Sequence, residues 1–187
     1  MYENVHIVGC GTIGSNLAIS LSLQGKVKNL FLYDMDVVNR EGTSYIFPFS
    51  EKCKGLFKTH VVRDCIKYLV NSSVNIYTEE IEITKPISSG IGLVIDCRDR
   101  KFSSIQCHVR LSLDRHILVI DSLEETEADF PSYVLSQEPE YLSLAISIIT
   151  AYLQKNDFRF PTKILYDLDD IIDNYDIIER GLKDGSS

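Results

Sequence analysis

A glycine-rich hexapeptide near the start of the chain constrains the fold more than any other feature. Residues 9–14 read G-C-G-T-I-G, follow a short apolar run and open a segment of helical period, Thr12–Leu23. A strand, a G-x-G-x-x-G turn and a helix in this order are typical of the phosphate-binding unit of nucleotide-binding α/β folds. In that unit Gly9 permits the tight turn, Gly11 lets a phosphate approach the backbone, and Gly14 lets the helix pack closely on the strand.

The first turn of this helix and the strand that follows it add two more features of a nucleotide site. The N–H groups at the helix start, including those of Thr12 and Ile13, and the positive end of the helix dipole face an anion bound there. Asp34 ends the next apolar run, twenty residues after Gly14, where a carboxylate can accept the ribose hydroxyls. NAD and ATP both carry a ribose and phosphates, so these residues leave both ligands open.

Short β-branched runs alternate with helical segments along the rest of the chain. Further strands are expected at Val74–Tyr77, Leu93–Ile95, Ile117–Ile120 and Lys163–Tyr166, and helices at Leu56–Leu69, Phe102–Leu113 and Tyr141–Gln154. This alternation predicts an α/β, Rossmann-like fold with a mostly parallel sheet flanked by helices. We expect residues 1–187 to form one domain, with the nucleotide-binding motifs in 1–121 and a C-terminal extension of helix and strand in 122–187.

The composition excludes several classes of function. With 19 basic against 27 acidic residues, the net charge is −8, which argues against non-specific binding of nucleic acid. No apolar run approaches the roughly 20 residues of a membrane span, and no basic region precedes the first apolar stretch as in a signal peptide. The five cysteines have irregular spacing with no CxxC pair, so we expect reduced core residues, a cytoplasmic protein and no zinc.

Four segments resemble motifs of the ThiF/MoeB/HesA family of adenylyltransferases and ubiquitin-like-protein activating enzymes. Residues 25–30, G-K-V-K-N-L, are similar to the family's approach to its second strand, and residues 34–38, D-M-D-V-V, resemble its D-x-D-x-V motif. Residues 55–58, G-L-F-K, resemble G-x-x-K at a helix start, and residues 96–99, D-C-R-D, resemble D-C-x-D after the fourth strand. Because the four occur in the family's order, they favour ATP over NAD.

The resemblance implies a reaction and roles for particular residues. Members of the family bind ATP and Mg²⁺ and adenylate the C-terminal carboxylate of a small ubiquitin-like or carrier protein, usually as homodimers or heterodimers. Asp34 would then hold the ribose, with Asp36 as a second polar group beside it. Lys58 would neutralise the phosphates, and Asp99 would bind Mg²⁺ or orient the triphosphate. The residues alone leave other interpretations open: Lys58 as a solvated helix lysine, and Asp99 as the N-cap of the helix expected from Phe102.

A non-periodic stretch from Met35 to Lys54 departs from the family pattern. Typical members carry an Asn and, three residues later, an Arg in this loop, and both contact the ATP phosphates. Gly42 and Tyr45 stand in those places here, although Arg40 lies nearby and can replace the missing cation if the loop is shifted. Loss of such contacts weakens catalysis more than nucleotide binding. No cysteine follows Cys107, so a thioester-forming role is not expected.

Three hypotheses therefore remain. The first is an adenylyltransferase with weakened catalysis that acts on the C-terminus of a small ubiquitin-like or carrier protein. The second is a catalytically inactive nucleotide-binding scaffold that pairs with an active partner. The third is an NAD-dependent oxidoreductase, which the absence of a Tyr-x-x-x-Lys motif disfavours. Among the smaller signals, we expect His6 to be a core residue, His60 to lie on the surface, and Asp96 to be a strand-end residue rather than a ligand.

Overall fold

The computed structural model describes residues 2–39, 47–69, 74–84, 87, 92–98, 109–114, 117–121, 139–155 and 163–172. Strands and helices alternate in the first part of the chain: β1 (Tyr2–Val8), α1 (Thr12–Leu23), β2 (Val27–Tyr33), the short 3₁₀ helix η1 (Glu51–Cys53), α3 (Lys58–Leu69), β3 (Asn75–Glu79) and β4 (Leu93–Asp96). The second part comprises β5 (Val109–Asp114), β6 (Ile117–Asp121), α4 (Pro139–Lys155) and β7 (Lys163–Asp167), followed by helical residues 168–172.

The seven strands form a single sheet in the order β3-β2-β1-β4-β5-β6-β7. The first five strands in this order are parallel, and β6 is antiparallel to both of its neighbours. The predicted Rossmann-like α/β fold with a mostly parallel sheet is therefore confirmed. The chain runs outward from β1 to β3 and then returns to the other side of β1 with β4. Such a reversal point, at the carboxyl ends of the strands, is where open α/β sheets bind ligands.

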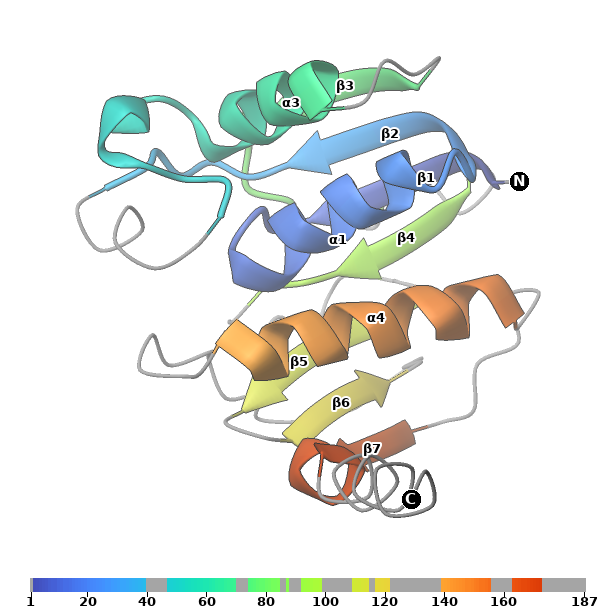
Figure 1. Cartoon of the computed structure of the whole chain (residues 1–187). Coiled ribbons are helices and arrows are strands. Elements are labelled where there is room, and N and C mark those ends of the chain that lie inside the picture. The colour runs from blue at the N-terminus through green and yellow to red at the C-terminus, as the bar shows by residue number, and fades with distance from the viewer. Residues whose placement is uncertain are drawn as a thin grey trace, which may run out of the picture.

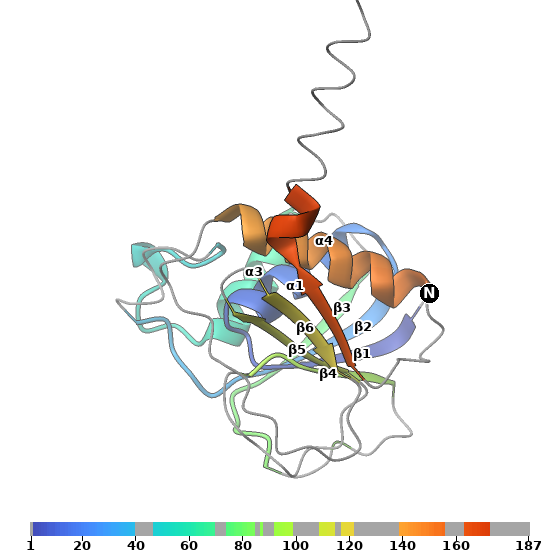
Figure 2. The ribbon, with the colours of Figure 1, turned by 90° about the horizontal axis from the view of Figure 1, so that it is seen from below.

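The main core lies between the sheet and the helices α1, α3 and α4, which all cover the same face (Figures 1 and 2). Apolar residues at helical spacing, such as Leu17 and Leu21 on α1, point at the sheet and are fully buried. They meet alternate residues of the strands, such as Leu30 and Leu32 on β2. This packing fixes α1 against β1 and so determines where the loop between them lies.

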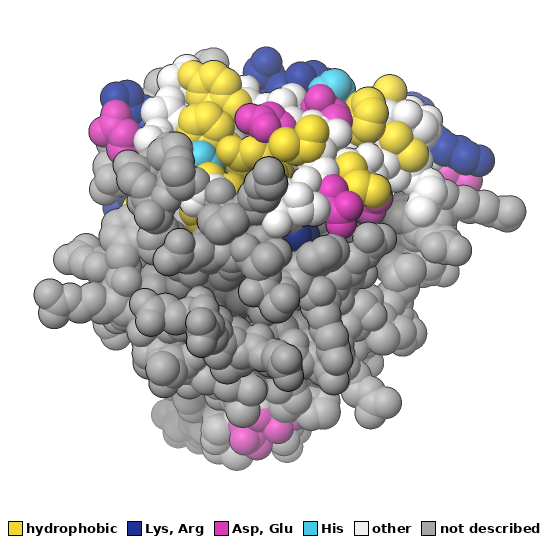
Figure 3. Space-filling view, turned by 180° about the vertical axis from the view of Figure 1, so that it is seen from behind, with side chains coloured by type: hydrophobic (Ala, Val, Ile, Leu, Met, Phe, Trp, Pro, Cys, Tyr) yellow, Lys and Arg dark blue, Asp and Glu magenta, His cyan; other side chains and the backbone are white. Residues whose placement is uncertain are grey.

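The opposite face of the sheet carries rows of side chains that cross the strands in register. His6, Phe31 and Tyr77 are paired across β1, β2 and β3, and their rings stack at centroid distances of 4.4 and 4.7 Å. His6 is only 2% exposed and its Nδ1 lies 2.9 Å from the hydroxyl of Tyr33, so the prediction of a core histidine is confirmed. In the described part of this face, exposed hydrophobic side chains lie beside acidic ones (Figure 3).

One predicted element is wrong. The helix expected at Phe102–Leu113 cannot extend over its last five residues, because Val109–Asp114 form the strand β5; residues 102–108 lie outside the described residues. The sequence V-R-L-S-L-D alternates apolar and polar residues, and Leu111 and Leu113 are buried on one face of the sheet. Antiparallel pairing with β6 satisfies the backbone of this strand, which a six-residue pattern alone does not reveal.

In the described part of the chain, we find no helix that is both long and apolar enough to cross a membrane.

Candidate functional site

The glycine loop joins β1 to α1 at the carboxyl edge of the sheet, and its three glycines have different surroundings. Gly9 has φ +91°, a backbone conformation that favours glycine. A Cβ atom on Gly14 would overlap the carbonyl oxygen of Gly9, so the first turn of α1 can pack against the loop only if residue 14 is glycine. A Cβ atom on Gly11, by contrast, would have no atom of the described residues within 4 Å. Two glycines thus serve packing, and the third leaves open space in front of α1.

The start of α1 presents backbone rather than side chains to this space. Gly11 is the N-cap residue, and as a glycine it has no side chain with which to cap the helix. The side chains of Thr12 and Ile13 point into the protein, with exposures of 8% and 6%. Because the first N–H groups of an α-helix have no partner within the helix, these residues offer hydrogen-bond donors and the positive end of the dipole to an anion.

Asp34 connects the end of β2 to the glycine loop. Its Oδ2 accepts a hydrogen bond of 2.7 Å from the backbone N–H of Cys10, and its Oδ1 accepts one of 2.8 Å from the N–H of Asp36. Burial raises the pKa of Asp34, while the charge of Lys58 and the two N–H donors oppose that rise. Burial also raises the pKa of Cys10, so its thiol is not an activated nucleophile. The carboxylate therefore lies beside the loop, as its spacing from Gly14 predicted.

Lys58 is the first residue of α3, and its ammonium lies at the same edge of the sheet. Its Nζ is 2.8 Å from Oδ2 of Asp36, and its backbone N–H donates to the Asp36 carbonyl at 3.0 Å. Two more backbone bonds pair the neighbouring segments, from Val38 to Leu56 and from Gly55 to Val38. The lysine side chain is 20% exposed. Its charge therefore stands next to Asp34 and within reach of solvent.

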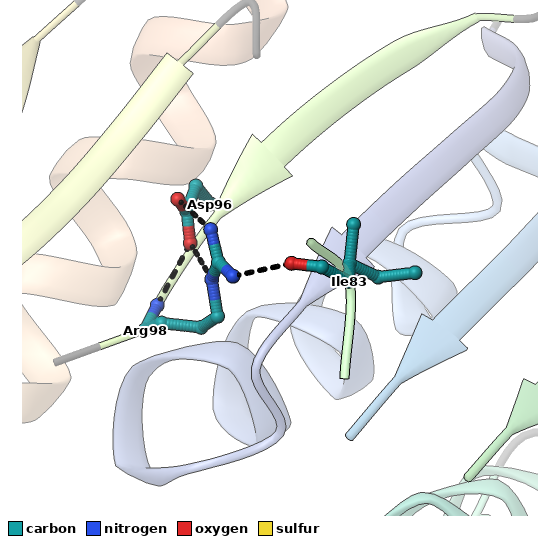
Figure 4. Close-up of polar contacts among 3 residues, drawn as sticks. All are labelled: Ile83, Asp96 and Arg98. Atoms are coloured by element: carbon teal, nitrogen blue, oxygen red, sulfur yellow. Dashed lines mark hydrogen bonds and ion pairs between the residues drawn. The ribbon is translucent and has the colours of Figure 1, made fainter. Parts of the chain in front are cut away.

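A second ion pair closes the other side of the loop, at the end of β4 (Figure 4). The Nε and Nη2 atoms of Arg98 donate to the two carboxylate oxygens of Asp96 at 2.9 and 2.8 Å, and Nη1 donates to the carbonyl of Ile83 at 2.9 Å. Asp96 is 2% exposed, at the end of its strand as expected. Sequence reasoning missed Arg98. The available signal was an arginine two residues after a carboxylate that ends a buried strand, because a buried carboxylate requires a counter-charge.

Several predicted site residues cannot be placed. Arg40, Gly42, Tyr45 and Asp99 all lie outside the described residues, so the roles of Arg40 and Asp99 remain predictions. Among the described residues there is no group of three or more His, Cys, Asp or Glu side chains that could hold a metal ion. His60 lies 2.8 Å from Glu80 and is partly exposed, in agreement with a surface position.

The site therefore gathers complementary groups at the reversal point of the sheet. An uncapped helix start and the open space at Gly11 suit an anionic group, Asp34 suits a group with hydroxyls, and Lys58 supplies a positive charge. These are the chemical requirements of a nucleotide with ribose and phosphates.

Several solved structures have a fold similar to that of this chain. Escherichia coli MccB, determined with AMPCPP and MccA, matches with a TM-score of 0.60 at 15% identity, over 87% of this chain and 60% of that one. MccB determined with ATP matches with a TM-score of 0.62 at 16% identity, over 82% and 55%. PaaA matches with a TM-score of 0.64 at 16% identity, over 90% and 70%. This chain thus spans at most 60% of those MccB chains, and at such identities the likeness shows the fold alone.

No curated protein matches the chain in sequence. The sequence pattern of the ThiF family, however, matches residues 3–128, which is well over half of the 187 residues. Because the matched region includes the glycine loop, Asp34, Lys58 and the Asp96–Arg98 pair, the chain belongs to the ThiF family.

Proposed function

We propose that this chain binds ATP at the glycine loop and adenylates the C-terminal carboxylate of a small ubiquitin-like or carrier protein. The observation that carries the proposal is the open space at Gly11, which lies at the uncapped start of α1 beside Asp34. MccB, a protein of similar fold, has been determined with ATP and with its partner MccA, which supports both the nucleotide and a polypeptide acceptor.

In the proposed complex, the phosphates occupy the space that a Cβ atom on Gly11 would fill. The N–H groups at the start of α1 donate to phosphate oxygens, and Asp34 accepts the ribose hydroxyls. Lys58 exchanges Asp36 for the triphosphate, which its partial exposure permits. Asp99 is the residue that we propose for Mg²⁺, which would neutralise charge on the phosphates when bound.

The proposed reaction joins the acceptor's carboxylate to AMP. A carboxylate oxygen attacks the α-phosphorus, the bond from this phosphorus to the bridging oxygen breaks, and pyrophosphate leaves with that electron pair. Negative charge grows on the α-phosphate oxygens and on the pyrophosphate during this step. Lys58 and the helix N–H groups stabilise that charge because they are already aligned before the reaction.

We propose that turnover is weaker than in typical members of the family, because Gly42 and Tyr45 stand where phosphate-contacting Asn and Arg are expected. The same substitutions favour a second candidate function, an inactive nucleotide-binding subunit in a homodimer or heterodimer. ATP–pyrophosphate exchange, with and without candidate carrier proteins, separates the two. Strong exchange by the chain alone would contradict weakened catalysis, and no exchange with any carrier or partner would favour the inactive subunit.

Calorimetry with ATP and NAD tests the nucleotide itself. We expect ATP to bind more tightly than NAD, since the D-x-D and G-x-x-K segments meet beside the glycine loop. Binding of NAD without binding of ATP would overturn the proposed function and restore the oxidoreductase hypothesis.

Arg40 is the residue that we propose as the replacement cation in the long loop. If it stabilises the transition state, Arg40→Ala lowers exchange about 100-fold or more, because a group of this kind contributes about 2.7–4 kcal/mol. Lys52→Ala, which removes another positive charge of the same loop, serves as the control. An Arg40→Ala variant as active as the wild type would leave an arginine of a partner subunit as the remaining source.

A further inference from the structure

Arg98 contacts three segments of the chain that meet at the carboxyl edge of the sheet. Its guanidinium forms a bidentate ion pair with Asp96 at the end of β4. The same carboxylate accepts a hydrogen bond of 3.1 Å from the backbone N–H of Arg98. Its Nη1 holds the carbonyl of Ile83, in the segment that follows β3 (Figure 4). Arginine suits this task because its planar fork directs several donors at once, which a lysine cannot do.

The stem of the same side chain lies against the glycine loop. A Cβ atom on Gly9 would stand 2.9 Å from Cγ of Arg98 and 3.1 Å from its backbone nitrogen. Arg98 therefore occupies the side of the turn that glycine leaves open, where the backbone has φ +91°. Two backbone bonds complete the junction, from Gly9 N–H to the Tyr33 carbonyl and from Cys97 N–H to the Val8 carbonyl, each of 2.8 Å.

The guanidinium is directed at protein oxygens, and the Arg98 side chain as a whole is 12% exposed. Three of its nitrogen atoms already donate, to Asp96 and to Ile83, within 2.8–2.9 Å. Moving it toward a phosphate would leave the carboxylate of Asp96 without the guanidinium in a buried position, which is costly. These contacts suit a residue that supports the loop rather than one that binds the ligand.

We propose that Arg98 is a positioning residue that holds the Gly9 turn in the conformation that binds the nucleotide phosphates. This inference rests on the proposed function, since it concerns the same loop. A phosphate is bound well by backbone N–H groups only when their directions are fixed before it arrives, because ordering them on binding costs affinity. Arg98 supplies that order by joining β4, the segment after β3 and the turn itself.

The test uses ATP, AMP and adenosine as competitors against a fluorescent ATP analogue. If Arg98 acts through the phosphate loop, Arg98→Ala weakens the binding of ATP and AMP by about tenfold or more, a loss of the size seen when residues that support the ligands of metal sites are removed. Adenosine has no phosphate, so its affinity stays within twofold of the wild type. Arg98→Lys restores part of the loss, because it keeps the stem against Gly9 and one donor.

A matched control and a second variant separate positioning from folding. Arg63 forms an ion pair with Asp64 on α3, so Arg63→Ala removes an arginine of similar kind without touching the loop, and all three affinities should stay unchanged. If Arg98→Ala does not fold, the double variant Asp96→Asn/Arg98→Gln carries the test, since it removes both buried charges. Its glutamine is two atoms shorter than arginine and does not bond residue 96 and Ile83 at once, so ATP and AMP still weaken.

The outcomes distinguish this inference from the proposed function. Wild-type protein that binds no ATP would overturn the proposed function itself. If the wild-type protein binds ATP, and the Arg98 variants bind ATP and AMP as tightly as the wild type does, the positioning role alone is overturned. Equal weakening of ATP, AMP and adenosine would also overturn it, because it would indicate a general loss of structure.

Discussion

Two ion pairs flank the glycine loop, and their shortest distances are the same, yet their surroundings differ. Lys58 and Asp36 meet at 2.8 Å at the end of β2, where their side chains are 20% and 49% exposed. Arg98 and Asp96 meet at 2.8 Å at the end of β4, with side-chain exposures of 12% and 2%. The first pair is joined by one hydrogen bond. In the second pair, Arg98 binds Asp96 through two hydrogen bonds and donates a third to the carbonyl of Ile83.

The difference shows that distance alone does not assign a role. A lysine in contact with solvent can exchange one anionic partner for another at little cost, so Lys58 is suited to receive a phosphate. A buried pair cannot separate without leaving an uncompensated charge, so the Asp96–Arg98 pair is suited to hold the backbone in place. One side of the loop is therefore open to a ligand, and the other side is fixed.

The largest expected effect comes from breaking the buried pair. Arg98→Ala should lower the free energy of unfolding by about 3 kcal/mol, because it leaves the Asp96 carboxylate buried without its guanidinium. Lys58→Ala should lower it by less than about 1 kcal/mol, the usual value for an exposed pair. Urea unfolding monitored by circular dichroism measures both. Equal losses in the two variants would remove the contrast between the pairs.

A slightly smaller effect is expected from filling the open space at Gly11. Gly11→Val should weaken ATP binding about 100-fold, because its branches occupy the phosphate position and each lost charge-assisted hydrogen bond costs about 1.5–3 kcal/mol. The melting temperature without ligand should fall only modestly, since Gly11 has φ −74° and a Cβ atom there meets no atom of the described part of the chain within 4 Å. Calorimetry and thermal melts measure the two quantities.

Gly11→Ala is the matched variant for this comparison. A single methyl group should give an intermediate loss of ATP affinity with a similar melting temperature. Unchanged ATP affinity in the valine variant would show that the phosphates do not lie at this loop.

The open side of the loop could be predicted from the sequence, and the fixed side could not. The order of strand, turn and helix and the distance from Gly14 to Asp34 are local features, and they brought Asp34 beside the loop as expected. The position of Lys58 followed from the resemblance of its segment to a family motif. Arg98 depends instead on Ile83 and Gly9, which come together only when the sheet is assembled.

The fold shows the same division between local and assembled features. Long segments with helical period, such as α1 and α4, were predicted nearly to their ends. The strand β5 was not, because six alternating residues carry a weak signal and its pairing partners β4 and β6 supply the rest. Tertiary pairing thus decided the structure where the local pattern was short.

The third effect sharpens the role of the exposed pair. Lys58→Ala should weaken ATP binding about tenfold, since a charge-assisted bond to a phosphate near solvent contributes about 1.5 kcal/mol. Adenosine should bind as in the wild type. Lys54→Ala, which removes an exposed lysine four residues earlier, should have little effect. A loss of the same size in both lysine variants would indicate that net charge, rather than the position of Lys58, attracts the nucleotide.

The smallest effect concerns Asp34, which follows β2 and accepts a hydrogen bond from the glycine loop. Burial raises its pKa above the ordinary value of 3.8, so folding favours its neutral form. The stability from this group is therefore fully present at low pH and is lost as the pH rises through the raised pKa. The side chain of Asp34→Asn stays neutral at every pH. The melting temperature of this variant without nucleotide should therefore rise relative to that of the wild type as the pH increases from below 3.8 to 7. We expect the gain to be small, because the charge of Lys58 and the two N–H donors oppose the effect of burial on the pKa of Asp34.

Asp64 offers a control of opposite sign, because the hydrogen bond from Arg63 lowers its pKa. Stability from Asp64 is present above its ordinary pKa and is lost as the pH falls, so Asp64→Asn should lose melting temperature relative to the wild type as the pH rises. If the melting temperature of Asp34→Asn also falls relative to the wild type, then Lys58 and the N–H groups of Cys10 and Asp36 affect the pKa of Asp34 more than burial does.

If the melting temperature of Asp34→Asn rises instead, the wild-type carboxylate of Asp34 destabilises the fold at pH 7. Asp34→Asn should then bind ATP less tightly than the wild type, because an amide accepts hydrogen bonds from the ribose hydroxyls less well than a carboxylate does. The wild-type Asp34 would thus lower the stability of the fold and raise the affinity for the nucleotide.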